Sequence, residues 1–251
     1  MQIIISPAKQ MKACDDFEVL GQPRFLNESK LLMTYLQALS LEELQALWRC
    51  SDKLALENYQ RIRDFSFERQ LSPAVFTYVG LQFQALGADV FTQAQLNYVQ
   101  KHLYILSGLY GLLRPFDGIN LYRLEMQAKL KGFSSPTLYQ FWADKLYHEL
   151  FAPGELVLNL ASKEYAKAVS PYLQAGDRFV SCRFAQRQNG KLVVKATAAK
   201  QARGDMVAYL AKVKAQGVEA VKSYQGYGYH YSEADSTASE LVFLLNNRKL
   251  L

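Results

Sequence analysis

The sequence predicts a mixed α/β (α+β) domain, one compact unit over residues 1–251, with a central mixed sheet flanked by helices. Three observations support this fold class. The short, wholly apolar runs 3–5, 103–106 and 156–158 have the composition of doubly buried strands. Stretches with helical spacing and helix-capping residues separate these runs. No repeat or long linker divides the chain, and its length suffices for a full core.

The first half of the chain is predicted to place one strand before a series of helices. The apolar run 2–5 ends at Ser6-Pro7. Residues 74–86 fit a helix or a strand, and we leave both open. The first predicted helix covers 30–39, with Asn27 or Ser29 as its cap. A second helix begins with a capping box formed by Ser40 and Glu43, and a third begins at Ser51 or Asp52. Thr92 caps a fourth helix.

The second half is predicted to alternate strands and helices more regularly. The apolar stripe from Leu138 to Leu150 predicts a single helix capped by Thr137. Asn189-Gly190 marks a hairpin between two strands. The remaining predicted strands are 103–106, 177–186 and 191–197, together with a short apolar strand that opens the stretch 156–162 and is followed there by polar turn residues. The remaining predicted helices are one that opens at Lys163 and stops at Pro171 and one over 198–216, and the chain has an apolar tail at 241–245.

Composition narrows the class of protein. A formal charge of +6 and a pI of about 9.1 favour an anionic partner. Three scattered cysteines form no Cys-x-x-Cys motif, which indicates a reducing compartment. We see no signal peptide and no apolar run of about 20 residues, so we expect a cytoplasmic protein with no membrane contact. Histidine and carboxylate spacing shows no metal pattern, and we expect neither a metal nor a cofactor.

The stretch Leu106 to Met126 is where we expect a site. The predicted strand at 103–106 is followed by Gly108 and Gly111, which allow a tight turn or a close backbone approach. Arg114 stands directly after this turn, before Pro115. The same residues fit a simple tight turn with a solvated arginine equally well.

Polar residues recur at the ends of the predicted strands. If these strands share one sheet and one direction, the polar residues meet in one cleft. Glu125 among cations such as Lys9 could then act as an acid or base, while a structural ion pair between Arg123 and Glu125 is the alternative. The residues in question are Lys9, Arg114, Arg123, Glu125, Ser162, Lys163 and Glu164.

A basic run follows in the C-terminal part. Between Arg183 and Lys214 there are eight basic residues and one acid, Asp205. Lys200 and Arg203, three residues apart, would share one face of a helix. The run is a candidate surface for phosphate groups. The commoner meaning of such a run is a solvated face.

These residues together resemble the bacterial YaaA family of peroxide stress resistance proteins. The resemblance spans nearly the whole chain in ordered blocks. The blocks include Ile5-Ser6-Pro7-Ala8-Lys9, Ser51-Asp52-Lys53-Leu54-Ala55, Leu106-Ser107-Gly108-Leu109-Tyr110-Gly111, Arg114-Pro115-x-Asp117, Tyr122-Arg123-Leu124-Glu125-Met126, Asn159-Leu160-Ala161-Ser162-x-Glu164-Tyr165 and Ala202-Arg203-Gly204.

The resemblance implies a cytoplasmic protein that limits hydrogen peroxide damage linked to free intracellular iron. It also implies DNA binding through a positively charged cleft and a helix-hairpin-helix element. That element would be either the turn Ser107–Gly111 or the helical pair near Lys53. We expect a monomer that binds duplex or distorted DNA without sequence preference. The candidate phosphate-binding residues are Lys53, Gly108, Gly111, Arg114, Arg123, Lys163, Lys200 and Arg203, and the candidate catalytic residues are Glu125 and Lys9.

The chain departs from the family at one block. Relatives tend to carry Lys-Gly-Asp-Val-Tyr-x-Gly-Leu where this chain has Val79-Gly80-Leu81-Gln82-Phe83-Gln84-Ala85-Leu86. A lysine, an aspartate and a tyrosine hydroxyl are therefore missing, which puts any activity that needs them in doubt. The alternative function is an enzyme that acts on a nucleotide-like or other anionic substrate in the same cleft. Direct iron sequestration is disfavoured, because clustered carboxylate and histidine ligands are absent from the sequence.

Overall fold

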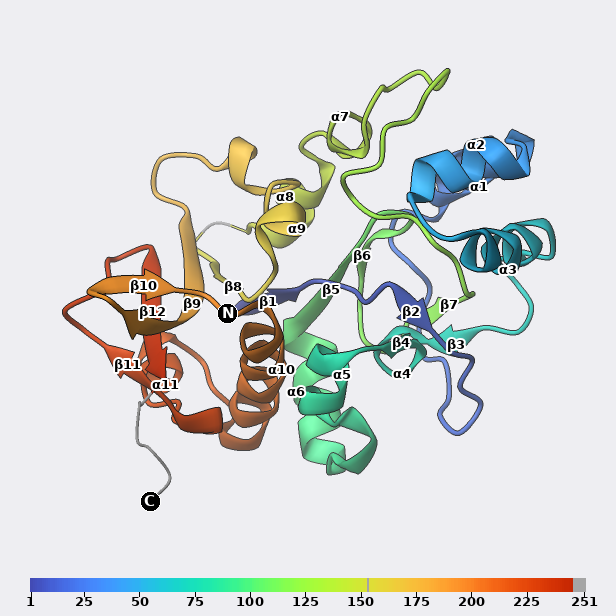
Figure 1. Cartoon of the computed structure of the whole chain (residues 1–251). Coiled ribbons are helices and arrows are strands. Elements are labelled where there is room, and N and C mark those ends of the chain that lie inside the picture. The colour runs from blue at the N-terminus through green and yellow to red at the C-terminus, as the bar shows by residue number, and fades with distance from the viewer. Residues whose placement is uncertain (153, 246–251) are drawn as a thin grey trace.

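A parallel core of apolar strands organises the molecule. The computed structural model describes residues 1–152 and 154–245 (Figure 1). The main sheet has the order β11-β12-β9-β8-β1-β5-β6, and β10 pairs with β9. Its strands are β1 (Gln2–Ile5), β5 (Leu103–Ser107), β6 (Gly111–Leu113), β8 (Leu156–Asn159), β9 (Arg178–Gln188), β10 (Lys191–Val193), β11 (Tyr229–Ser232) and β12 (Glu240–Leu245).

The apolar runs seen in the sequence occupy the centre of this sheet. β1 pairs in parallel with β5 on one side and with β8 on the other, and β8 pairs in parallel with β9. Ile3, Ile4 and Ile5 are fully buried, as an unalternating strand of a parallel sheet should be. β6, β10 and β11 run antiparallel to their neighbours, so the sheet is mixed, as predicted.

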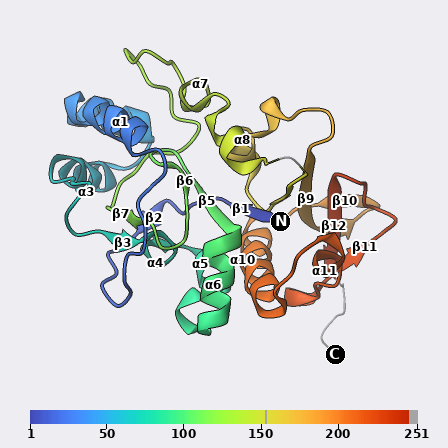
Figure 2. The same ribbon diagram turned by 180° about the vertical axis from the view of Figure 1, so that it is seen from behind.

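Helices cover both faces of the sheet. In Figures 1 and 2 the helices α5, α6 and α10 lie on one side and α8 and α9 on the other, while α1 to α3 stack beyond the β5–β6 side. The helices are α1 (Leu26–Ala38), α2 (Leu41–Trp48), α3 (Asp52–Arg63), α4 (Ala74–Thr77), α5 (Leu81–Leu86), α6 (Gln93–His102), α7 (Leu138–Trp142), α8 (Lys145–Leu150), α9 (Lys163–Ala166), α10 (Ala196–Val213) and α11 (Val218–Lys222).

Short elements complete the fold. Two small two-stranded ladders join β2 to β4 and β3 to β7. The four strands are β2 (Gln10–Met11), β3 (Ser72–Pro73), β4 (Tyr78–Val79) and β7 (Gly118–Ile119), and the 3-10 turns are η1 (Ala88–Val90), η2 (Ser170–Tyr172) and η3 (Gly226–Gly228). The β2–β4 ladder fastens the chain after β1 to the chain before α5.

The helix starts with a full capping signature are confirmed. Ser40 and Glu43 form the predicted capping box of α2, and Thr92 forms another with Gln95 at α6. The predicted cap of α1 is wrong: this helix begins after Phe25, and the Ser29 hydroxyl donates to the Phe25 carbonyl instead.

Several predicted elements have different bounds. The helix predicted from Lys163 to Pro171 ends at Ala166, and a separate 3-10 turn covers Ser170–Tyr172. The segment 74–86 holds α4, β4 and α5 in succession, so neither a single helix nor a single strand is correct. The helix predicted after Thr137 divides into α7 and α8 at Ala143, whose φ of 45° no helix can accommodate. The strand predicted over 191–197 ends at Val193, because Ala196 already begins α10 after the cap residue Lys195.

Candidate functional site

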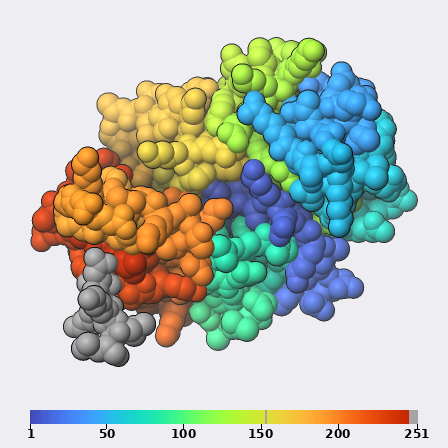
Figure 3. Space-filling model, in the orientation of Figure 1, coloured from blue at the N-terminus to red at the C-terminus, as the bar shows by residue number. Residues whose placement is uncertain are grey.

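A cavity lies beside the carboxyl ends of β1 and β8. It has a volume of about 500 Å³. Figure 3 shows the N-terminal segment at the surface in this region, between the green and yellow segments above and the teal segment below. We call it the switch pocket, and its lining residues are Ser6, Pro7, Ala8, Lys9, Gln10, Val79, Gly80, Leu81, Gln82, Phe83, Tyr122, Arg123, Leu124, Glu125, Ser162, Glu164, Tyr165, Lys200 and Arg203.

Hydrogen bonds between the two strand ends fix the floor of the switch pocket. The Ser162 backbone N–H donates to the Ser6 hydroxyl oxygen at 2.9 Å, and the two hydroxyl oxygens lie 3.2 Å apart. The Gln82 side-chain amide donates to the Ser6 carbonyl at 2.9 Å. Three segments that are distant in the sequence are therefore held around Ser6.

Glu125 lies among cations, as the sequence predicted. Its Oε1 accepts from Arg123 Nη2 at 2.9 Å and lies 3.4 Å from Lys9 Nζ. Glu125 is buried, while the Lys9 side chain is 63% exposed. The ion pair between Arg123 and Glu125 exists, and it lies in the wall of the pocket, so this geometry fits a structural and a chemical role.

A second carboxylate lies nearby. Glu164 is half-buried, and its Oε1 accepts from the Gln127 backbone N–H at 3.3 Å. Burial raises the pKa of Glu164, and the negative charge of Glu125 adds to this, whereas that backbone N–H and the Lys9 cation oppose it. The two carboxylates therefore have different environments, which is the arrangement that separates an acid from a base.

The two arginines of the switch pocket keep unused donors. The Nε atoms of Arg123 and Arg203 are buried and have no hydrogen-bond partner among the described residues. Within the same residues, Arg203 has no carboxylate close enough for an ion pair. Burial lowers the pKa of Arg203, because the charged form of a guanidinium is disfavoured away from water.

A buried chain of hydroxyl groups supports one wall. Tyr122 Oη lies 2.7 Å from Tyr78 Oη and 2.6 Å from Ser107 Oγ, and Ser107 Oγ accepts from the Tyr110 backbone N–H. Burial raises the pKa of Tyr122 to about 12, so its hydroxyl stays protonated at neutral pH. We did not predict this series of hydrogen-bonded hydroxyl groups from the sequence, because single tyrosines and serines far apart in the sequence form no recognisable motif.

The block that departs from the family forms the apolar wall of the switch pocket. Val79, Leu81 and Phe83 all line it. The family resemblance described above implies lysine, aspartate and tyrosine at these three positions. The departure therefore changes the pocket itself.

Five candidate residues lie outside the switch pocket. Lys53 is exposed on α3 and Lys163 is exposed at the start of α9. Arg114 follows β6, which runs antiparallel to β5, so it lies near the amino end of β5. There its guanidinium stacks on Tyr104 and donates to the Lys101 carbonyl. Gly108 and Gly111 are the remaining two.

The two glycines of the central turn are buried against the protein itself. A Cβ at Gly108 would lie 2.3 Å from the Leu124 carbonyl oxygen, and one at Gly111 would meet Trp142 and Leu146. Gly111 also has a φ of 71°, which glycine favours. The turn joins β5 to β6, so it is a β-hairpin, and the suggested helix-hairpin-helix at Ser107–Gly111 is wrong. The other candidate for a helix-hairpin-helix element, the helical pair near Lys53, consists of α2 and α3 joined by residues 49–51, and it stays a prediction.

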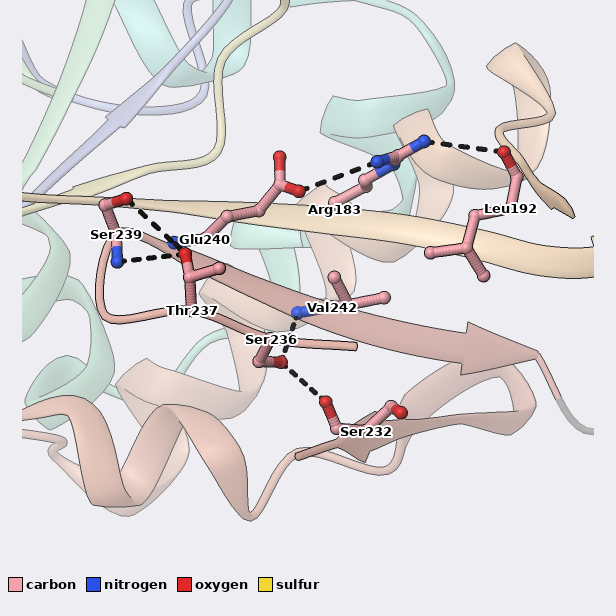
Figure 4. A network of polar contacts seen from close by, with 8 residues as sticks. All are labelled: Arg183, Leu192, Ser232, Ser236, Thr237, Ser239, Glu240 and Val242. Atoms are coloured by element: carbon pink, nitrogen blue, oxygen red, sulfur yellow. Dashed lines mark hydrogen bonds and ion pairs between the residues drawn. The ribbon is translucent and has the colours of Figure 1, made fainter. Parts of the chain in front are cut away.

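The basic run of the C-terminal part is partly neutralised. Arg183 Nη1 lies 3.6 Å from Glu240 Oε1, and Arg183 Nη2 donates to the Leu192 carbonyl (Figure 4). The loop before Glu240 is itself held by Thr237 and Ser236, whose hydroxyls accept from the Glu240 and Val242 backbone N–H groups. Arg187 pairs with Asp235 at 2.7 Å. The sequence count missed these partners because both acids lie beyond Lys214.

A second cavity of about 700 Å³ adjoins the first. It shares the lining residues Lys9 and Glu125 with the switch pocket, so the two cavities are neighbours, and we call them together the basic cleft. The buried Trp48 indole N–H in its wall has no partner among the described residues. The lining residues of this second cavity are Lys9, Tyr35, Leu39, Glu43, Ala46, Leu47, Trp48, Arg49, Glu125, Gln127, Ala128, Lys129 and Lys131.

In the described part of the chain, no group of three or more histidine, cysteine or acidic side chains is placed to hold a metal ion. No helix among residues 1–152 and 154–245 is both long and apolar enough to cross a membrane.

Comparison with known proteins places the chain in a family. A protein from Ligilactobacillus salivarius described as a UPF0246 protein is 48% identical over 247 residues, which cover 98% of this chain and all of the relative. A UPF0246 protein from Limosilactobacillus fermentum is 51% identical over 245 residues, which cover 97% and 99% of the two chains. The family model for peroxide stress protein YaaA matches residues 1–235. This match supports a role in oxidative stress, and the chain belongs to the family of peroxide stress protein YaaA.

Proposed function

We propose that this protein acts in the peroxide stress response of the cytoplasm by binding DNA through the basic cleft. The observation that carries the proposal is the charge of the cleft. Its two cavities are lined by seven basic residues, Lys9, Arg49, Arg123, Lys129, Lys131, Lys200 and Arg203, and by three acidic ones, Glu43, Glu125 and Glu164. A surface of this kind attracts a polyanion.

The outer cations of the cleft are suited to phosphate contacts. Arg49, Lys129, Lys131 and Lys200 are exposed, and none of them pairs with a carboxylate of the described residues. Contacts of exposed lysines with the phosphate backbone carry no sequence information. We therefore expect binding of duplex or distorted DNA without sequence preference. Lys53 on the neighbouring α3 is an additional candidate contact.

The proposed benefit in the cell is protection of DNA from damage linked to free intracellular iron. This connection rests on the family resemblance together with the basic cleft. We propose a monomer as the binding unit.

The DNA proposal is tested by charge reversal. We expect Lys129→Glu with Lys131→Glu to weaken binding to all DNA sequences and to lower the slope of log K against log salt by about 2, since each lost phosphate contact removes ~0.9. Fluorescence anisotropy with a labelled duplex between 50 and 200 mM salt would measure it.

The matched control reverses two lysines outside the cleft. Lys212 and Lys214 are exposed at the end of α10, and their reversal changes the net charge by the same amount. An equal loss of affinity in this control would show that net charge, and no particular surface, determines binding. That result would contradict the proposal.

A second candidate function is catalysis on an anionic substrate in the switch pocket. It is favoured by Glu125 between Lys9 and Arg123, with the differently placed Glu164 close by. We expect Glu125→Gln to leave DNA affinity within about twofold, because this variant removes no cation. In cells that rely on this protein, the same variant should abolish survival of hydrogen peroxide, since loss of a general acid or base typically costs 10²–10⁴-fold in rate.

The control is the peroxide survival of cells that carry Glu68→Gln. This variant alters an exposed carboxylate that lines neither cavity. Thermal unfolding of both variants checks that they remain folded. Cells that survive peroxide with Glu125→Gln as well as with the unaltered protein would exclude a catalytic role for Glu125.

A further inference from the structure

The switch pocket occupies the position where open α/β sheets bind their ligands. β1 and β8 are neighbours in the main sheet. The next strand of this sheet after β1 in the chain is β5, which pairs with the side of β1 away from β8, and the next strand after β8 is β9, which pairs with the side of β8 away from β1. The adjacent strands β1 and β8 therefore form a topological switch point, and ligands bind in the crevice beyond the carboxyl ends of such strands. The pocket residues Ser6 and Ser162 stand at these two ends.

The charged residues in the lining of the pocket favour an anion. Arg123 and Arg203 line it, and each has a buried Nε without a partner among the described residues. Arg123 pairs with Glu125, whereas Arg203 has no carboxylate partner among the described residues. A guanidinium withdrawn from water without a counter-charge is unfavourable, and an oxyanion supplies both the charge and the acceptors. The lining contains four cations and two carboxylates, which is an excess of two positive charges. The cations are Lys9, Arg123, Lys200 and Arg203, and the carboxylates are Glu125 and Glu164. This excess matches a phosphate monoester, which carries roughly −1.5 to −2 charges at pH 7.

Part of the pocket lining is apolar and partly aromatic. Val79, Leu81 and Phe83 come from β4 and α5, and Leu124 adds to them. Leu81 is 37% exposed, although it is a large apolar side chain at the edge of a charged cavity. A phosphate of the DNA backbone would leave this wall unused, whereas a flat ring could pack on it.

We propose that the switch pocket binds a small phosphate monoester that carries a flat heteroaromatic ring, which is the chemistry of a nucleoside monophosphate. The phosphate group binds Arg203 and Arg123, and the ring packs on Val79, Leu81 and Phe83. The proposal deepens the second candidate function and rests on it for the use of the pocket. It does not depend on DNA binding by the outer lysines.

Calorimetric titration of the full chain tests the proposal. The probes are AMP, GMP, CMP and UMP, with ribose 5-phosphate and inorganic phosphate as ringless controls at constant ionic strength. We expect at least one nucleotide to bind at least tenfold more tightly than both ringless probes. Arg203→Gln should lower the affinity for that nucleotide at least tenfold. Leu81→Ser should lower the ratio of the nucleotide affinity to the affinity for ribose 5-phosphate.

The matched control is Arg69→Gln, which alters an exposed arginine whose side chain lines neither cavity and should leave nucleotide affinity unchanged. Thermal unfolding shows whether Arg203→Gln is folded, and Arg203→Lys, which keeps the charge without the planar fork, should bind with intermediate affinity. Equal affinity for all probes, or nucleotide binding that survives Arg203→Gln, would overturn the proposal.

Two further comparisons identify the source of the phosphate and separate the proposals. Tight binding of a 5′-phosphorylated DNA dodecamer, with no affinity for free nucleotides, would overturn the proposal in favour of a DNA end. Nucleotide binding, together with full survival of peroxide by cells that carry Glu125→Gln, would support the pocket while it excludes a catalytic role for Glu125. Loss of DNA binding in the Lys129 and Lys131 variant, with nucleotide affinity retained, supports two separate sites.

Discussion

Gly204→Ala is expected to destabilise the protein by about 3 kcal/mol or more, the upper end of the range for overpacked cores. Gly204 lies in α10 where this helix packs against α5. A Cβ there would lie 1.9 Å from the Gln82 carbonyl oxygen and 3.0 Å from the Leu86 backbone nitrogen. Both are backbone atoms, so no side-chain rotation relieves the overlap. Alanine adds about 1 kcal/mol of helix propensity, which is too little to offset the clash.

This substitution also separates the two walls of the switch pocket, because α10 carries Arg203 and α5 carries Phe83. Urea unfolding measures the stability. The control is Gly217→Ala, since Gly217 has an extended backbone and a Cβ added to it would meet no atom within 4 Å. A Gly204→Ala variant as stable as this control would mean that α5 and α10 do not approach each other so closely.

The second large effect is a pH dependence from Asp117. This carboxylate is buried after β6 and accepts from the Arg114 backbone N–H at 2.8 Å. Burial raises its pKa from 3.8 to about 6. The folded state therefore binds the proton more tightly than the unfolded chain does. The stabilisation from this proton is complete below about pH 4 and is lost as the pH rises through 6, a change of about 2–3 kcal/mol.

Asp117→Asn should remove this dependence, because the amide keeps an oxygen for the Arg114 N–H and carries no charge at any pH. We expect the variant to be more stable than the unaltered protein by about 2 kcal/mol at pH 8, with the difference shrinking towards pH 5. Denaturant unfolding at pH 5, 6, 7 and 8 measures the difference. A difference that stays constant across this range would contradict an elevated pKa.

The parts of the fold that the sequence predicted are those with a strong local signal. The wholly apolar strands β1, β5 and β8 could be identified because nothing in them alternates. The caps at Ser40 and Thr92 could be identified because they satisfy backbone donors within four residues. The break at Ala143 could not, because alanine is the best helix former and its positive φ depends on surrounding contacts.

The site was harder to predict, since it depends on strand direction and on partners far away in the sequence. Arg114 and Arg203 look alike as isolated arginines. The antiparallel course of β6 takes Arg114 to the other end of the sheet, whereas α10 brings Arg203 to the pocket. Gly108 gives the same sequence signal whether its close neighbour is a ligand or the Leu124 carbonyl.

The central position of β1 has a consequence for synthesis on the ribosome. The partners of residues 2–5 are made much later than these residues themselves, because β5 begins only at Leu103 and β8 only at Leu156. At about 5–20 residues per second, β1 waits about 5–20 s for β5 and longer for β8. A short isoleucine-rich segment without a partner is prone to aggregate. Nascent chains should therefore engage chaperones until β8 is complete, and folding should be slow because the central pairings are long-range.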